Sequence, residues 1–179
     1  MKSKILIVLA ICFSIAGCDK IKDATSITVN TKLEMSIPIS VISVGMKSAT
    51  LTSTATAYTF SKTQDLSLES NTDISPYLSK INEISMNGVI ITISGLSAGQ
   101  TINSISLDVA GIGNVFTQTN ITAANNSFTP NVAAGILSQM GTKLKADNKL
   151  TFTISGNASG TMTFTVGINI DTKVVVYTI

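Results

Sequence analysis

Hydrophobic and polar residues alternate along much of the chain with a period of two. From Ile27 to Val41 the odd positions are mostly apolar and the even positions mostly polar. This period predicts a β-strand with one buried face. The stretch is longer than most strands, so we expect a bend near Glu34 or a division into two strands. Pro38 lacks the backbone N–H that a sheet ladder needs, which predicts a sheet edge.

Further segments show a similar enrichment in β-branched and aromatic residues, bounded by glycine and asparagine. A polar segment over residues 61–73 interrupts them and is interpreted as a loop. We expect strands over residues 50–60, 84–94, 101–110, 114–119, 149–155, 161–169 and 173–179.

Two segments have helical rather than strand character. Each begins with a hydroxyl residue followed by proline, a pair that caps a helix and starts its first turn. We expect a short helix over residues 76–81 and a longer one over residues 130–145. In the longer helix, apolar residues share one face at helical spacing, namely Ala133, Ile136, Leu137, Met140 and Leu144.

About eight or nine short strands with turns between them predict an all-β domain. We expect a two-sheet β-sandwich, immunoglobulin-like in the broad sense, that covers residues 26–179 as a single domain. A closed β-barrel is the alternative architecture.

The N-terminus has the pattern of a secretion signal. Lys2 and Lys4 precede an apolar stretch over residues 5–15, and small residues follow it. The apolar stretch is shorter than the roughly 20 residues of a membrane-spanning helix. Residues 1–17 are therefore interpreted as a signal peptide.

The signal peptide ends in Ile15-Ala16-Gly17-Cys18. This motif resembles the lipobox of bacterial lipoproteins. The resemblance implies cleavage between Gly17 and Cys18 by a type II signal peptidase, and fatty acyl chains such as palmitate on Cys18. Residues 18–25 would then be the lipidated cysteine and a short tether. The exported part is similar to uncharacterised envelope lipoproteins with β-sandwich domains.

The lipid implies a location in the cell envelope, held to a membrane through Cys18. Two or more acyl chains anchor a protein stably, whereas one chain anchors it only marginally. We expect the outer membrane or the cell surface. Asp19 resembles an inner-membrane retention signal, so the inner membrane stays open as an alternative.

Charge and composition narrow the function classes. Without Lys2 and Lys4, ten lysines face ten acidic residues, and arginine is absent. This balance argues against nucleic-acid binding, which depends on clustered Lys and Arg. Histidine is also absent, which removes the most common general base and metal ligand. We therefore expect no enzymatic activity, no cofactor and no metal centre.

The remaining candidates for chemistry are carboxylates. Asp65, Glu69 and Asp73 are spaced by four and could supply oxygen ligands to a calcium ion. They lack the close spacing and the glycine of known calcium loops, so a solvated acidic loop is the preferred interpretation. A glycosidase needs a pair of carboxylates. The possible members are Glu34, Glu69, Glu83, Asp108 and Asp171, none of which the sequence context distinguishes.

Two functions remain. The first is a non-catalytic binding, adhesion or structural module whose partner is another envelope protein or a polymer. The alternative is a carrier of a small apolar ligand, held in a cavity between the sheets or under the 130–145 helix. An enclosed apolar cavity of about 300–1,000 Å³ would favour the carrier.

Overall fold

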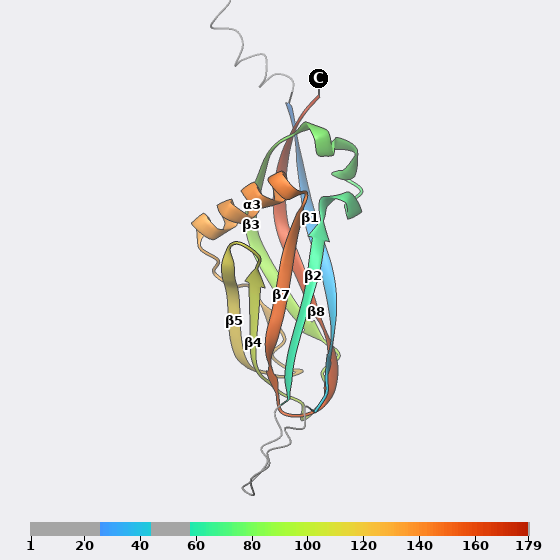
Figure 1. Cartoon of the computed structure of the whole chain (residues 1–179), viewed down its shortest axis with the longest axis vertical. Coiled ribbons are helices and arrows are strands. Elements are labelled where there is room, and N and C mark those ends of the chain that lie inside the picture. Colours follow the sequence, from blue (N-terminus) through green and yellow to red (C-terminus); the bar gives the residue numbers. More distant parts are fainter. Residues whose placement is uncertain (1–25, 44–57, 179) are drawn as a thin grey trace, which may run out of the picture.

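The computed structural model describes residues 26–43 and 58–178, which form a two-sheet β-sandwich (Figure 1). The predicted signal peptide, Cys18 and the predicted tether lie outside the described residues. Most of the predicted strand over residues 50–60 also lies outside them.

Each sheet contains four antiparallel strands. The first has the order β1-β8-β3-β6, with bounds Ser26–Val41, Met162–Tyr177, Ile81–Ser94 and Ser127–Phe128. The second has the order β2-β7-β4-β5, with bounds Thr59–Ser67, Lys149–Ala158, Ile102–Val109 and Gly113–Ile121.

This strand order is that of a jelly roll, in which the chain passes repeatedly between the sheets and the first strand lies beside the last. The β-sandwich prediction is confirmed. The sequence pattern did not distinguish the jelly-roll order from the immunoglobulin order. The described strands form two separate sheets, so the barrel alternative is wrong.

The pairing of β1 with β8 extends from Ser26 opposite Tyr177 to Val41 opposite Met162. Apolar residues of both strands point inward at the same register positions, such as Leu33 opposite Ile170 and Ile37 opposite Val166. Burial of each such side chain contributes roughly 1.5–3 kcal/mol. β1 begins and β8 ends at one end of the sandwich, which we call the N-terminal end (Figure 1).

The long β1–β8 ladder explains two errors of the sequence prediction. β1 continues without interruption through Glu34, and β8 replaces the two strands predicted at 161–169 and 173–179. Asp171, which falls between these two predicted strands, lies within β8 opposite Lys32. Each strand is stabilised along its whole length by the other, so neither needs the expected break.

The β1 edge is partly covered by side chains. Pro38 lies on this edge strand, as predicted. Gln64 Nε2 donates to the Ser36 carbonyl at 3.3 Å, and Asn71 Nδ2 donates to the Lys32 carbonyl at 3.2 Å. Together these residues limit pairing of another strand along β1.

The prediction of a loop over residues 61–73 is partly wrong. β2 extends through it to Ser67, followed by the 3₁₀ helix η1 over Leu68–Ser70. Polar residues of β2 face solvent on the outside of the second sheet, for example Thr63, whose hydroxyl lies 2.9 Å from that of Thr153. The hydroxyl-rich outer face therefore made a strand resemble a loop.

Both predicted helices exist, with shifted starts. The first is a 3₁₀ helix, η2, over Ser75–Lys80, and no side chain caps it. The second, α3, begins at Ala134 and ends at Asp147, so Pro130 does not start it as expected. Ala133 precedes α3 without a capping hydrogen bond. In the described residues no helix combines the length and the apolar character needed to cross a membrane.

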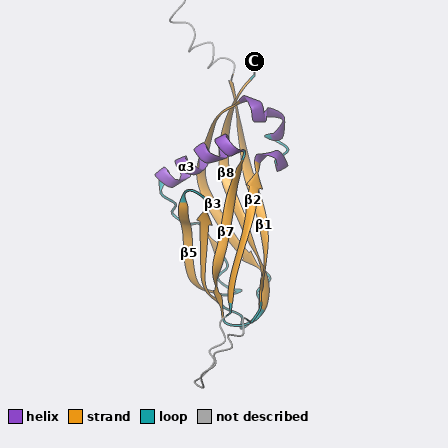
Figure 2. Cartoon of the chain, viewed as in Figure 1, coloured by secondary structure: helices purple, strands orange, loops and turns teal. Residues whose placement is uncertain are grey.

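Helix α3 lies across one end of the sandwich, where it contacts β3 and β7 (Figure 2). Met140 and Leu144 on its inner face are fully buried, which confirms the predicted apolar face at these positions. Ala133, at its start, is exposed instead. Gly141 marks a close approach, because a Cβ at this position would lie 2.3 Å from the Ile84 carbonyl oxygen of β3.

We predict that Met140→Asp lowers the free energy of unfolding by about 3 kcal/mol or more, because it buries a polar group without a partner. Lys143→Asp is the comparison. Lys143 is partly exposed and paired with Asp147 at 2.8 Å. Loss of that pair and of the dipole interaction costs about 1 kcal/mol or less. Urea midpoints measure both values, and equal midpoints would contradict the packing of α3.

We predict that Gly141→Ala lowers the urea midpoint, with a cost of about 1–3 kcal/mol, because the added methyl group meets the β3 backbone. Gly135→Ala is the matched control in the same helix, since a Cβ there meets nothing within 4 Å. Alanine is favoured over glycine in helices by up to about 1 kcal/mol, so the control should keep or raise the midpoint. An unchanged urea midpoint in Gly141→Ala would contradict the close packing of α3 against β3.

Candidate functional site

The three acidic residues considered as calcium ligands do not form a cluster. Asp65 lies on β2 and Glu69 in η1, while the carboxylate of Asp73 accepts a hydrogen bond from Thr31 Oγ1 at 3.0 Å. Over residues 26–43 and 58–178, no group of three acidic or other metal-binding side chains is close enough to hold a metal ion. These three residues lie on separate elements because β2 extends through the first part of the segment that was predicted to be a loop.

Asp65 is instead part of a surface pair between β2 and β7. Lys149 Nζ donates to Asp65 Oδ2 at 2.8 Å, and Thr151 Oγ1 donates to Asp65 Oδ1 at 2.6 Å. The hydrogen bond from Lys149, followed by that from Thr151, lowers the pKa of Asp65. The hydrogen bond to Asp65 in turn raises the pKa of Lys149. Both side chains are exposed, so salt screens this interaction.

The carboxylates considered as a glycosidase pair are also exposed or hydrogen-bonded to neighbours on their own sheet. Ser85 donates to Glu83 at 2.7 Å, Ser106 donates to Asp108 at 3.1 Å, and Asn87 donates to Asp171 at 3.3 Å. Glu34 accepts a hydrogen bond from Asn169 Nδ2 at 2.6 Å. These contacts bring no two of the candidates together around a common partner.

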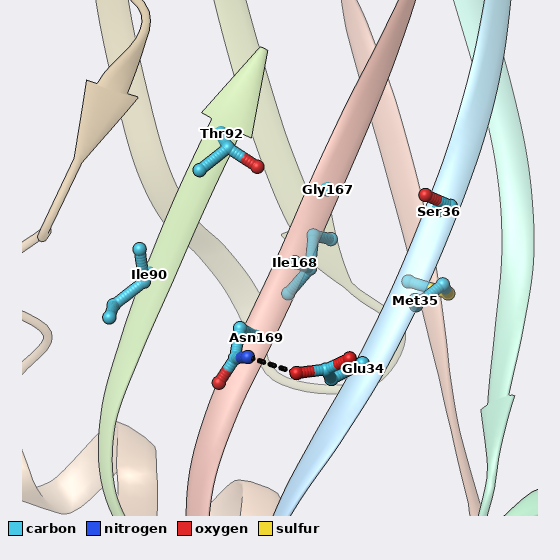
Figure 3. Close-up of a pocket in the computed structure, with 8 residues that line it drawn as sticks. All are labelled: Glu34, Met35, Ser36, Ile90, Thr92, Gly167, Ile168 and Asn169. Atoms are coloured by element: carbon cyan, nitrogen blue, oxygen red, sulfur yellow. Dashed lines mark hydrogen bonds between the residues drawn. The ribbon is translucent and has the colours of Figure 1, made fainter. Parts of the chain in front are cut away.

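One feature of the surface is a shallow depression on the outer face of the first sheet, with a volume of about 490 Å³. Strands β1, β8 and β3 cross it side by side (Figure 3). We call it the outer groove. Its solvent-facing residues are Glu34 and Ser36 of β1, Gly167 and Asn169 of β8, and Ile90 and Thr92 of β3.

The strand register arranges these residues in two rows across the sheet. Glu34, Asn169 and Ile90 lie opposite one another in the first row, and Ser36, Gly167 and Thr92 in the second. The Glu34–Asn169 hydrogen bond joins two side chains of the first row (Figure 3). Ile90 is 43% exposed, an unusual position for a large apolar side chain.

Gly167 leaves room for the Thr92 side chain in the outer groove. It lies in the central strand between Ser36 and Thr92, and a Cβ at this position would lie 2.6 Å from Thr92 Oγ1. Because glycine has no side chain, the Thr92 hydroxyl can lie close to the backbone of β8 here. The surrounding hydroxyl and amide groups can both donate and accept hydrogen bonds, and the Glu34 carboxylate accepts them.

A second depression of about 380 Å³ adjoins the outer groove and shares Ile90 and Asn169 with it. It extends toward the N-terminal end along Gly88, where Lys32 and Asp171 line it with charged side chains. The two depressions therefore form one hollowed strip along the outer face of the first sheet.

Of the outer-groove residues, sequence reasoning singled out only Glu34, and for a different role. Two signals were present in the sequence. Gly167 interrupts the β-branched pattern of its strand, and Ile90 occupies a position whose neighbours Val89 and Ile91 both point inward. Neither signal identifies a groove unless the strand register is known, because the register places Gly167 and Ile90 on the same face of the sheet as the residues of β1.

No family model matches the chain. No curated protein matches it either. Among solved structures it is similar to the decameric BFDV capsid protein, with 8% identity, 83% of this chain and 99% of that chain covered, and a TM-score of 0.40. It is also similar to a structure titled Desmodium yellow mottle tymovirus, with 10% identity, 83% and 88% covered, and a TM-score of 0.30. These likenesses are distant, and the fold is defined by the strand order of this chain.

We predict that Lys149→Met raises the pKa of the Asp65 carboxyl toward its ordinary value, as measured by NMR titration. In the wild-type protein the folded-state pKa lies below the unfolded-state value, so the pair contributes stability above the unfolded pKa. That contribution is lost as the pH falls through the folded pKa. High salt should reduce the difference between the variants. Lys62→Met is the control, because Lys62 lies on β2, the same strand as Asp65. An unchanged titration of Asp65 in Lys149→Met would contradict the pairing of Lys149 with Asp65.

Proposed function

We propose that this chain is a lipid-anchored protein of the bacterial cell envelope, and that its β-sandwich is a non-catalytic binding, adhesion or structural module. The observation that carries the proposal is the lipobox Ile15-Ala16-Gly17-Cys18 behind a matching signal peptide. A thiol at this position, preceded by small residues, is the acceptor of the diacylglycerol group in lipoproteins that share the motif.

The start of β1 at Ser26 supports an anchor at the N-terminal end. Residues 19–25 alone separate Cys18 from β1. Since an extended chain spans about 3.3–3.6 Å per residue, this tether reaches at most about 30 Å. The sandwich would therefore stay close to its membrane, with the N-terminal end toward the lipid and the turns that follow β3 and β7 away from it.

The side chains between the sheets favour a packed module over a carrier of apolar ligands. Phe152 and Ile154 of β7 are fully buried, as is Met140 under α3. These large side chains occupy the space in which a carrier would hold its ligand. The outer groove, in contrast, is open to solvent, and a partner can reach it directly. We infer that the first contact with a partner is made from outside the sandwich.

The location follows from the anchor. We favour the outer membrane or the cell surface, with the inner membrane as the alternative because of Asp19. The mature chain carries equal numbers of basic and acidic residues, so a partner recognised mainly by charge is not expected. Another envelope protein or an envelope polymer fits this balance better than nucleic acid does.

We predict that Cys18→Ser abolishes incorporation of radiolabelled palmitate and leaves a longer, uncleaved precursor on a denaturing gel. The reason is that hydroxyl oxygen does not replace the thiol as the acceptor of the lipid. Cys12→Ser is the matched control, since Cys12 lies inside the apolar stretch of the signal peptide and leaves with it. Labelling that persists in Cys18→Ser would contradict the lipoprotein proposal.

A further inference from the structure

Charged residues are distributed unevenly over the described part of the chain. Residues 35–43, 88–107, 109–142 and 150–170 contain no Asp, Glu, Lys or Arg. The charged side chains lie from the middle of the sandwich toward its N-terminal end, with Lys62 as the one exception among the described residues. Apart from Lys62, the described residues at the opposite end of the sandwich are therefore uncharged; they include hydroxyl and amide side chains as well as Ile42, which is 69% exposed.

The outer groove lies at the start of this uncharged region. Beyond the row of Ser36, Gly167 and Thr92, the next row consists of Pro38, Thr165 and Ser94. Glu34 is the only charged residue of the groove, and its carboxylate is hydrogen-bonded to Asn169. A ligand in the groove meets neutral hydrogen-bonding groups along most of its length.

These groups argue against two kinds of partner. An anionic polymer needs clustered Lys or Arg, and the groove contains neither. Protein interfaces depend on a few buried anchors, usually Trp, Tyr or Arg, and are depleted in serine. The groove presents serine, threonine, asparagine and glycine, with Ile90 as its exposed apolar side chain.

We propose that the outer groove binds an uncharged polysaccharide. This inference rests on the proposed binding function and specifies its partner. The sheet repeats its outward side chains every roughly 6.6–6.8 Å along a strand and about 4.8 Å between strands. Such a flat lattice of hydroxyl and amide groups matches the many hydroxyls of an extended sugar chain. The Thr92 hydroxyl beside Gly167 and the other polar groups of the groove hydrogen-bond to the chain, and Ile90 contacts the C–H surface of a sugar ring.

Each individual contact is weak, because hydrogen bonds to the groove replace hydrogen bonds to water. The groove contains no aromatic side chain on which a sugar ring stacks. Useful binding therefore requires many copies of the protein on one membrane acting on one polymer. A lipid anchor provides that arrangement, so the test must use the anchored protein on a surface rather than the free domain.

The experiment uses the full lipidated protein in vesicles of uncharged phosphatidylcholine. Retention is measured on beads that carry dextran, mannan or the β-glucan laminarin, and on beads that carry sulfated dextran. We expect retention on at least one of the neutral polymers, with little change between about 0.05 and 0.5 M NaCl, because no ion pair is involved.

Ser36→Lys and Thr92→Lys place a charge in the outer groove and should each reduce this retention by about tenfold or more. Ser61→Lys is the matched control, since Ser61 is an exposed serine on the edge strand of the other sheet. All three side chains are exposed, and equal urea midpoints would verify that the variants fold alike. We expect Ser61→Lys to bind like the wild-type protein.

Several results would overturn the inference. One is the absence of retention on all three neutral polymers, and another is retention on sulfated dextran alone that decreases with salt. A third is self-association that Ser36→Lys abolishes without any binding of polysaccharide, which would assign the groove to a protein contact. Palmitate labelling of the same preparations verifies the anchor separately, so loss of polysaccharide binding is distinguishable from failure of the lipoprotein proposal.

Discussion

The antiparallel pairing of β1 with β8 is the interaction on which the rest of the structure depends. It joins the first described strand to the last along sixteen residues of each. β8 then pairs with β3 on its other side, so one C-terminal strand holds the first sheet together. Because these contacts connect distant parts of the chain, the sheet forms only when nearly the whole domain is present. The inner face of the same ladder supplies much of the core, and its outer face carries the groove.

The period-two pattern was sufficient to predict the architecture but not its details. Residues with a clear alternation, such as those of β1 and β3, were predicted as strands and are strands. Asp171 falls between two predicted strands, where the sequence predicted a break. It is in a strand because its neighbours on β1 and β3 determine its conformation. The two-residue strand β6 has too little sequence to show a pattern, and it exists through its contacts with β3. Pro130 was also misleading, since it precedes α3 without starting it.

The candidate site was less predictable than the fold, for a physical reason. A groove on a sheet is made by side chains from different strands, and its shape depends on their register. Gly167 acquires its role only because Ser36 and Thr92 lie on either side of it. The proposed anchor is the opposite case, because the motif that resembles a lipobox is continuous in the sequence and an enzyme would recognise it in the unfolded chain. The sequence therefore carries a direct argument for location, whereas the argument for a partner comes from the assembled surface.

The register of β1 with β8 also has a mechanical consequence. A pull on the chain at Ser26, directed away from the sandwich, acts along β1 and parallel to the strand that holds it. Hydrogen bonds of an antiparallel ladder are perpendicular to the strands, so such a load shears many of them at once rather than opening them singly. β1 would have to slide past β8 before it detached. A domain anchored at this end and loaded on its outer face thus resists force along the direction in which its longest ladder is strongest.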